Sequence, residues 1–145
     1  MQYSDLAAKQ VARGATRPET VDYYGRVRVA VIDTKVAAAD TNITLCKFPA
    51  GRIRILGATS FITATFATGG TTAKIGYTAY AEVGGAKIVA DDDAFLAATA
   101  GSAITSKPLA TLVINSDTGF DLVVNTSANL AANDTIKGVV QFVID

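Results

Sequence analysis

The sequence predicts an all-β protein, an antiparallel β-sandwich of jelly-roll type, and three observations support this. Short segments alternate polar and apolar residues, and turn residues separate them. The composition is rich in β-branched Val, Ile and Thr, which favour strands. Twelve glycines supply tight turns. A chain of 145 residues has the size of one domain, and it contains no run of about 20 apolar residues that would predict a membrane span.

Residues 1–25 differ from the rest of the chain, and we expect them to form an N-terminal arm. Ser4 can cap a short helix that Gly14 would end, but such a helix is too short to be stable by itself. Residues 15–20 then show neither strand nor helix periodicity. A frayed terminus is the alternative. The β-sandwich domain is expected over residues 26–145.

The first strands are predicted from alternation with a period of two. Residues 26–31 alternate Arg with Val, and residues 52–55 repeat the pattern after a turn at Pro49–Gly51. Residues 60–66 form the next predicted strand, with Ile62, Ala64 and Phe66 as the core side. Gly69 and Gly70 predict a hairpin turn into residues 72–80, and Gly84 and Gly85 predict a second tight turn.

One connection interrupts this pattern. Residues 91–99 read as one or two helical turns, because three aspartates can cap the start and Ala, Phe and Leu follow them. Strands resume at residues 111–115 and 120–125. The last strand, residues 135–144, has apolar residues on both faces, which predicts a central strand or one pressed against a neighbour.

The composition argues against several classes of function. There is no His and a single Cys, so a His-based triad, a His-ligated metal and an intrachain disulfide are excluded. The net charge is zero, with 13 basic and 13 acidic residues, so no overall charge attracts nucleic acid or a membrane surface. We therefore expect a protein that is not an enzyme and has no cofactor, no metal, no nucleic-acid partner and no membrane partner.

Two charged groups remain as candidate sites. Arg26, Arg28, Arg52 and Arg54 would form one cluster if their two strands were neighbours, and guanidinium groups bind acidic partners through forked hydrogen bonds. A solvated strand face is the equally weighted alternative. The triplet at residues 91–93 could bind Ca²⁺, but it lacks alternating Asp spacing and a distal Glu, so a helix cap is favoured.

The five tyrosines are scattered and there is no Trp, so packing is favoured over a sugar-binding platform. Tyr77 and Tyr80 would fall on opposite faces of a regular strand.

Three stretches carry a resemblance: Phe48–Ala58 (FPAGRIRILGA), Ala90–Thr99 (ADDDAFLAAT) and Asp134–Phe142 (DTIKGVVQF). With them, the chain resembles the head decoration (cement) proteins of tailed bacteriophages. The resemblance implies a virion structural protein that is made in the host cytoplasm, binds the major capsid protein on the capsid surface and forms a homo-oligomer, specifically a trimer.

The expected partner contacts lie on the arm and on the two arginine-bearing strands. Arm ordering costs conformational entropy, so docking must add apolar or charge-paired contacts. The predicted contact residues are Leu6, Val11, Arg13, Arg17, Tyr23, Tyr24, Arg26, Arg28, Arg52 and Arg54. Another phage structural role, in a minor capsid or tail protein, and a carbohydrate-binding jelly-roll module are the alternatives.

Overall fold

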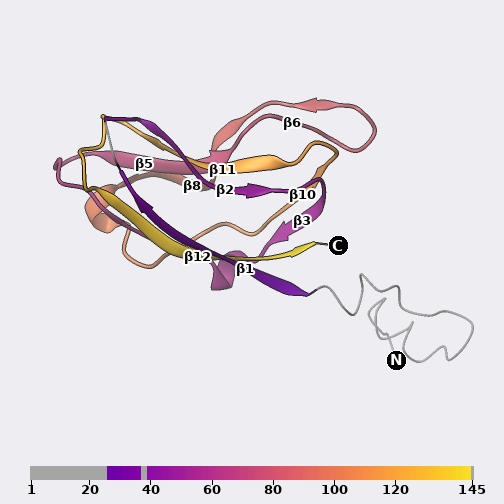
Figure 1. Cartoon of the computed structure of the whole chain (residues 1–145), viewed down its shortest axis with the longest axis horizontal. Helices are drawn as coiled ribbons and strands as arrows, with labels where there is room; N and C mark the ends of the chain where they lie inside the picture. The colour runs from indigo at the N-terminus through magenta and orange to yellow at the C-terminus, as the bar shows by residue number, and fades with distance from the viewer. Residues whose placement is uncertain (1–25, 37–38, 145) are drawn as a thin grey trace, which may run out of the picture.

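The computed structural model describes residues 26–36 and 39–144, and these residues form an antiparallel β-sandwich (Figure 1). Short 3₁₀ turns, η1 (Gly57–Thr59) and η2 (Gly101–Ala103), are the helical elements in this part of the chain. The strands are β1 (Val27–Lys35), β2 (Asn42–Phe48), β3 (Gly51–Ile55), β4 (Phe61–Thr65), β5 (Thr72–Tyr77), β6 (Tyr80–Ala81), β7 (Lys87–Ile88), β8 (Asp91–Ala100), β9 (Lys107–Pro108), β10 (Leu112–Ser116), β11 (Phe120–Thr126) and β12 (Thr135–Ile144).

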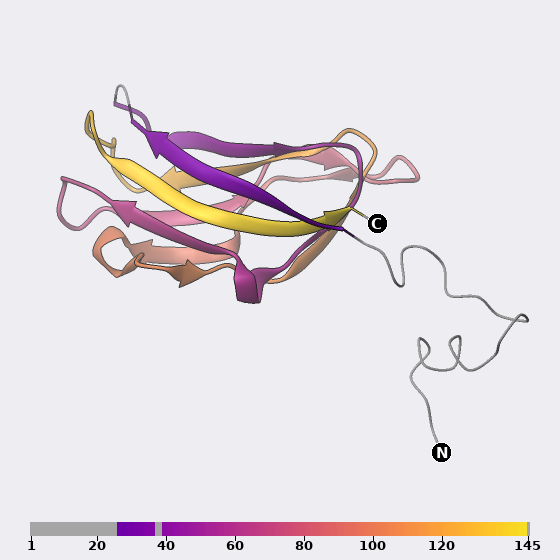
Figure 2. The same cartoon turned by 60° about the horizontal axis from the view of Figure 1, so that its bottom comes forward.

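The larger sheet is organised around β12. Strand β1 pairs along one edge of β12, from Val27 opposite Val143 to Lys35 opposite Thr135. The other edge is shared by β3 and β4, which pair with successive parts of β12. Strand β10 continues the sheet beyond β3, and β9 continues it beyond β4. Figure 2 turns this sheet toward the viewer, with yellow β12 between indigo β1 and magenta β4.

The second sheet has the strand order β2-β11-β5-β8, and a separate two-stranded hairpin is formed by β6 and β7. Successive strands of the chain cross repeatedly between the sheets, so spatial neighbours are far apart in sequence. This order confirms the predicted antiparallel β-sandwich, in which two sheets are connected by such crossings, and the jelly-roll type stays a prediction.

The core lies between the two sheets and consists mainly of aliphatic side chains. The largest fully buried hydrophobic residues are Ile53, Ile55, Ile62, Ile75, Ile104, Ile114, Leu122, Leu130, Ile136, Val124 and Val140. An aromatic group closes one part of the core, where the ring of Phe48 stacks on Phe120 and meets Phe142 edge-on, each at 4.9 Å between centroids. Burial of these side chains supplies the main stabilisation of the fold.

Several sequence predictions are confirmed. The last strand covers residues 135–144 and is central, since β1 lies on one side of it and β3 and β4 on the other. Ile136 and Val140 are buried on the face of β12 that they share with Phe142. Ile62 is buried, and the predicted turn at Gly84 and Gly85 joins the paired strands β6 and β7, with φ of 104° and 91° that suit glycine.

The predicted helix at residues 91–99 is wrong, because this segment is strand β8, paired with β5. Ile75 pairs with Leu96, and Tyr77 pairs with Asp91. An advance of two residues along β5 therefore corresponds to five residues along β8. Such bulges break the period of two, and this made the strand look helical in the sequence. At the bulge, the backbone of β8 comes so close that a Cβ on Gly76 would lie 1.8 Å from the carbonyl oxygen of Asp91.

The predicted hairpin at Gly69 and Gly70 is also wrong in one respect. A turn occurs there, and Gly70 has a φ of 79°. However, the strands that it joins belong to different sheets: β4 pairs with β12 and β9, whereas β5 pairs with β11 and β8. The turn therefore crosses between layers of the sandwich, and the local residues that encode it do not reveal that difference.

Ser60 fills the gap that β3 and β4 leave on the edge of β12. The chain bulges outward at η1 between these two strands, and Ser60 is fully buried at the end of the bulge. Its hydroxyl donates to the carbonyl of Leu56 at 2.8 Å and accepts from the backbone N–H of Gln141 at 2.8 Å. The side chain thus replaces a missing strand neighbour and holds β3 and β4 in one sheet.

Candidate functional site

The most unusual surface of the described residues is the outer side of β1. Val27, Val29 and Val31 are 54%, 55% and 77% exposed, whereas Ile32, on the opposite face of the same strand, is 3% exposed and belongs to the core. Residues of a strand alternate between faces, so all three valines point away from the sandwich. The strand therefore presents its β-branched apolar residues to the surroundings.

The apolar surface continues across neighbouring strands. Directly opposed residues of paired strands lie on the same face, so Val31, Val139 and Phe61 form one row across β1, β12 and β4. Val27 begins a second row of opposed residues. In it Val27 lies opposite Val143, Val143 lies opposite Arg54, and Arg54 lies opposite Val113 on β10. We call the apolar members of this surface the valine face: Val27, Val29, Val31, Phe61, Val113 and Val139.

The rest of the outer surface is polar. In the next row toward the amino end of β12, Lys137 lies between Thr63 and Asp33, and its Nζ is 3.4 Å from the Asp33 carboxylate. A shallow groove connects this polar row with Val31, Phe61 and Val139. The surface therefore combines an apolar centre with charges of both signs at its border.

The four arginines do not form the single cluster that neighbouring strands would have produced. Strand β12 separates β1 from β3, because the two strands pair with opposite edges of it. Arg52 and Arg54 share the outer side of β3, since Ile53 and Ile55 between and after them are fully buried. Arg28 shares the inward side of β1 with Ile32 and is exposed at the end of the strand.

The other predicted contact residues belong to the arm. Leu6, Val11, Arg13, Arg17, Tyr23 and Tyr24 lie outside the described residues. Arg26 is the first described residue, and the chain enters β1 directly after it. The arm therefore joins the sandwich at one end of the valine face.

The acidic triplet is a strand terminus and not a helix cap. One carboxylate oxygen from each of Asp91, Asp92 and Asp93 lies within 4.8 Å of the others. Asp92 forms an ion pair with Lys74 at 3.3 Å, and the Asp91 carboxylate accepts the backbone N–H of Asp93 at 3.2 Å. Local hydrogen bonds and an ion pair thus account for two of the three carboxylates.

The two tyrosines in the described part of the chain, Tyr77 and Tyr80, pack against other aromatic rings. Tyr77 and Tyr80 lie at the end of β5 and the start of β6, and their rings meet edge-on at 5.6 Å, which corrects the expectation of opposite faces. Burial, followed by the charge of Asp91, raises the pKa of Tyr77. Their contacts with Phe95 and Phe120 join them to the core and leave no open stack for a sugar.

Cys46 packs partly buried against the core. Burial, followed by the charge of Asp121, raises the pKa of its thiol to about 12. A thiol with such a pKa stays protonated at neutral pH, and the thiolate is the nucleophilic form. The residue therefore behaves as a small apolar side chain.

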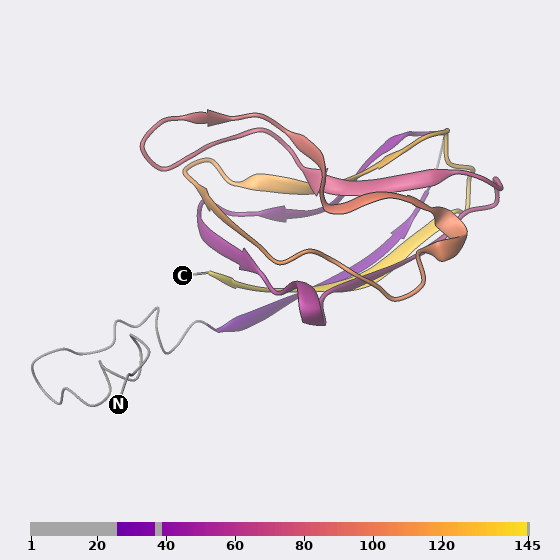
Figure 3. The ribbon, with the colours of Figure 1, turned by 180° about the vertical axis from the view of Figure 1, so that it is seen from behind.

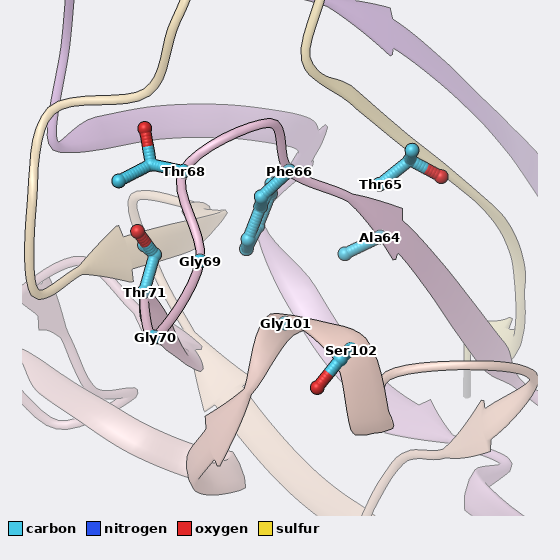
Figure 4. Close-up of a pocket in the computed structure, with 9 residues that line it drawn as sticks. All are labelled: Ala64, Thr65, Phe66, Thr68, Gly69, Gly70, Thr71, Gly101 and Ser102. Carbon is cyan, nitrogen blue, oxygen red and sulfur yellow. The ribbon is translucent and has the colours of Figure 1, made fainter.

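A pocket of about 260 Å³ lies between the β4–β5 turn and η2 (Figure 4). Thr65, Thr68 and Ser102 are among its lining residues, none of which is charged. Phe66 packs on Gly101, where an added Cβ would lie 2.3 Å from the ring, so the ring is used for packing. The Thr71 hydroxyl is buried without a hydrogen-bond partner in the described structure and is therefore inaccessible to a ligand.

No helix in the described ranges is long and apolar enough to cross a membrane.

No protein-family model matches the chain, and no curated protein matches it. Among solved structures, a chain described as belonging to the cyanophage Pam1 capsid asymmetric unit is similar, with 19% sequence identity, a TM-score of 0.53 and 100% of both chains covered. At this identity the likeness shows a shared fold: this chain has the β-sandwich architecture of that cyanophage protein.

Proposed function

We propose that this protein is a virion structural protein of a tailed bacteriophage, a decoration or cement subunit that binds the capsid surface. The observation that carries the proposal is the likeness of its fold, over the full length of both chains, to a chain of a phage capsid asymmetric unit. The valine face supports a role that depends on contact, because large exposed apolar patches mark interaction surfaces.

The proposed partner is the major capsid protein, and the proposed assembly is a homo-oligomer, a trimer, on the capsid lattice. The arm residues and the arginines of β1 and β3 would supply the contacts with neighbouring subunits. Arginine suits this role because its guanidinium forms two parallel hydrogen bonds with a carboxylate. The mechanism is added contact area that stabilises the head, and it requires no chemical reaction.

Binding to capsid shells tests this function. Shells assembled from the major capsid protein of the same phage are sedimented with the full chain, with a chain lacking residues 1–24, and with Arg52→Glu. We expect the full chain to pellet with the shells, the shortened chain to stay in solution, and Arg52→Glu to bind more weakly. The control is Lys87→Glu, an exposed charge reversal on β7, which should bind as the unmodified chain does.

Circular dichroism and thermal unfolding verify that each variant is folded. The core is built from residues 26–36 and 39–144, so the shortened chain should retain the sandwich. Absence of binding by the full chain, or undiminished binding by the shortened chain, would contradict the proposal. Binding to isolated tails instead of shells would assign the protein to the tail.

A further inference from the structure

We infer that the valine face is the surface on which a second copy of this chain packs. This inference deepens the proposed homo-oligomeric role: it concerns a two-fold contact between copies, which is separate from the contacts within the proposed trimer. It rests on the proposed role in taking the partner to be a second copy. It names a surface that the arm and arginine contacts do not include. The argument uses the exposure of the face, the charges at its border, its size and the point where the arm begins.

The exposure is concentrated on β1 and continues through Val139 to Phe61, whereas Arg54 separates Val113 from these residues. Three valines of one strand are more than half exposed, and Phe61 and Val113 add side chains that are 42% and 45% exposed. Isolated exposed apolar residues are ordinary, but a contiguous group of this kind on one sheet face marks a surface that becomes covered. Strand β1 is also an edge strand among the described residues, with β12 as its paired neighbour.

The charges around the face favour a copy of the same chain. A symmetric pair places the same surface of each copy against itself, so the surface must be complementary to itself. Asp33 and Lys137 provide both signs at the border, and Lys35 follows on the same side of β1. A rotated copy can therefore set acidic against basic groups. The net charge of zero adds no overall repulsion between copies.

The size of the face matches part of a stable interface. With nine residues in β1 and three strands across, the outer surface that holds the valine face and its charged border measures about 30 Å by 15 Å, or roughly 450 Å² in projection. A stable interface covers about 800 Å² on each partner. The arm joins β1 at the edge of this face, so the arm of each copy starts where the second copy lies and can add the remaining area.

Sedimentation velocity of the purified full chain, without capsid protein and over a wide concentration range, tests the inference. We expect the chain to self-associate and Val31→Asp to weaken that association by at least about thirtyfold, as for a residue at the centre of an interface. The matched control is Val89→Asp. Val89 is 77% exposed, as Val31 is, but it follows β7 in the hairpin that extends from the other side of the sandwich (Figure 3).

Val29→Asp provides a second variant on the same face, and unfolding curves verify that all variants are folded. The inference is overturned if the full chain is monomeric throughout, or if Val31→Asp and Val89→Asp associate equally well. A monomeric chain that still binds capsid shells would refute this inference and leave the proposed function standing. A chain that self-associates but binds no shells would contradict the proposed function and leave this inference standing.

Discussion

Replacing Ser60 by alanine should destabilise the sandwich through one identifiable group, the backbone N–H of Gln141. In the protein, the Ser60 hydroxyl accepts this N–H at 2.8 Å, and the serine is fully buried. The other groups at the site keep their partners: the Leu56 carbonyl still accepts the N–H of Thr59, and the Gln141 carbonyl still accepts the N–H of Leu56. The substitution therefore leaves a single orphaned donor.

The magnitude follows from this count. A buried hydrogen-bonding group left without a partner costs about 1–3 kcal/mol, so we expect a loss of about 2 kcal/mol in the free energy of unfolding. For a domain of this size, that loss corresponds to a decrease of roughly 6–12 °C in the melting temperature. It shifts the ratio of folded to unfolded protein by about thirtyfold.

Urea unfolding monitored by circular dichroism measures the effect, with Ser102→Ala as the control. Ser102 is exposed in η2, so its replacement should change the free energy of unfolding by less than about 0.5 kcal/mol. If Ser60→Ala were as stable as the control, the hydroxyl would not be holding β3 and β4 on β12. A change in the slope of the urea dependence, without a change in the midpoint, would also refute the reasoning.

Three further predictions concern other buried groups. Asp134→Ala removes the acceptor of two backbone N–H groups, at 2.7 and 2.8 Å. Chemical denaturation should show a decrease of about 3 kcal/mol in the free energy of unfolding. Asp134→Asn keeps one acceptor oxygen and should show a smaller decrease. Gly76→Ala should unfold at a much lower temperature than the unmodified chain, because the added methyl group would collide with the backbone of β8 at Asp91. Equal melting temperatures would mean that β8 does not approach Gly76 so closely. The thiol of Cys46 should react with iodoacetamide far more slowly in the folded protein than in denaturant at pH 8, and equal rates would contradict its raised pKa. Since the unfolded chain loses this proton first, the free energy of unfolding should decrease as the pH rises from about 9 to about 12.

Only part of the candidate site could be predicted from the sequence. The alternation of residues 26–31 separates arginines from valines correctly, but it does not say which set faces the core. The missed signal lies further along the chain, where Ile32 of β1 and Val36, directly after the strand, continue the set opposite the valines and are buried. Extending the alternation past Val31 would have shown apolar residues on both faces and pointed to a covered outer surface.

The arginine cluster fails for a different reason. Its formation required β1 and β3 to be adjacent, but β12, from the other end of the chain, lies between them. The pairing of Val27 with Val143 joins residues that no local pattern relates. Such long-range contacts decide which side chains share a surface, and the sequence of a single chain does not encode them in any short segment.

By itself, the sequence determined that the chain is a β protein, where most strands and turns lie, and that β12 has two apolar faces. These properties depend on neighbouring residues, through β-branched composition, alternation and glycine turns. The tertiary structure decided that residues 91–100 are a bulged strand, that the turn at Gly69 and Gly70 crosses between sheets, and that the valines of β1 point outward. The physical reason is that a strand is completed by its partners: pairing and burial against distant segments select the register, the bulges and the buried face.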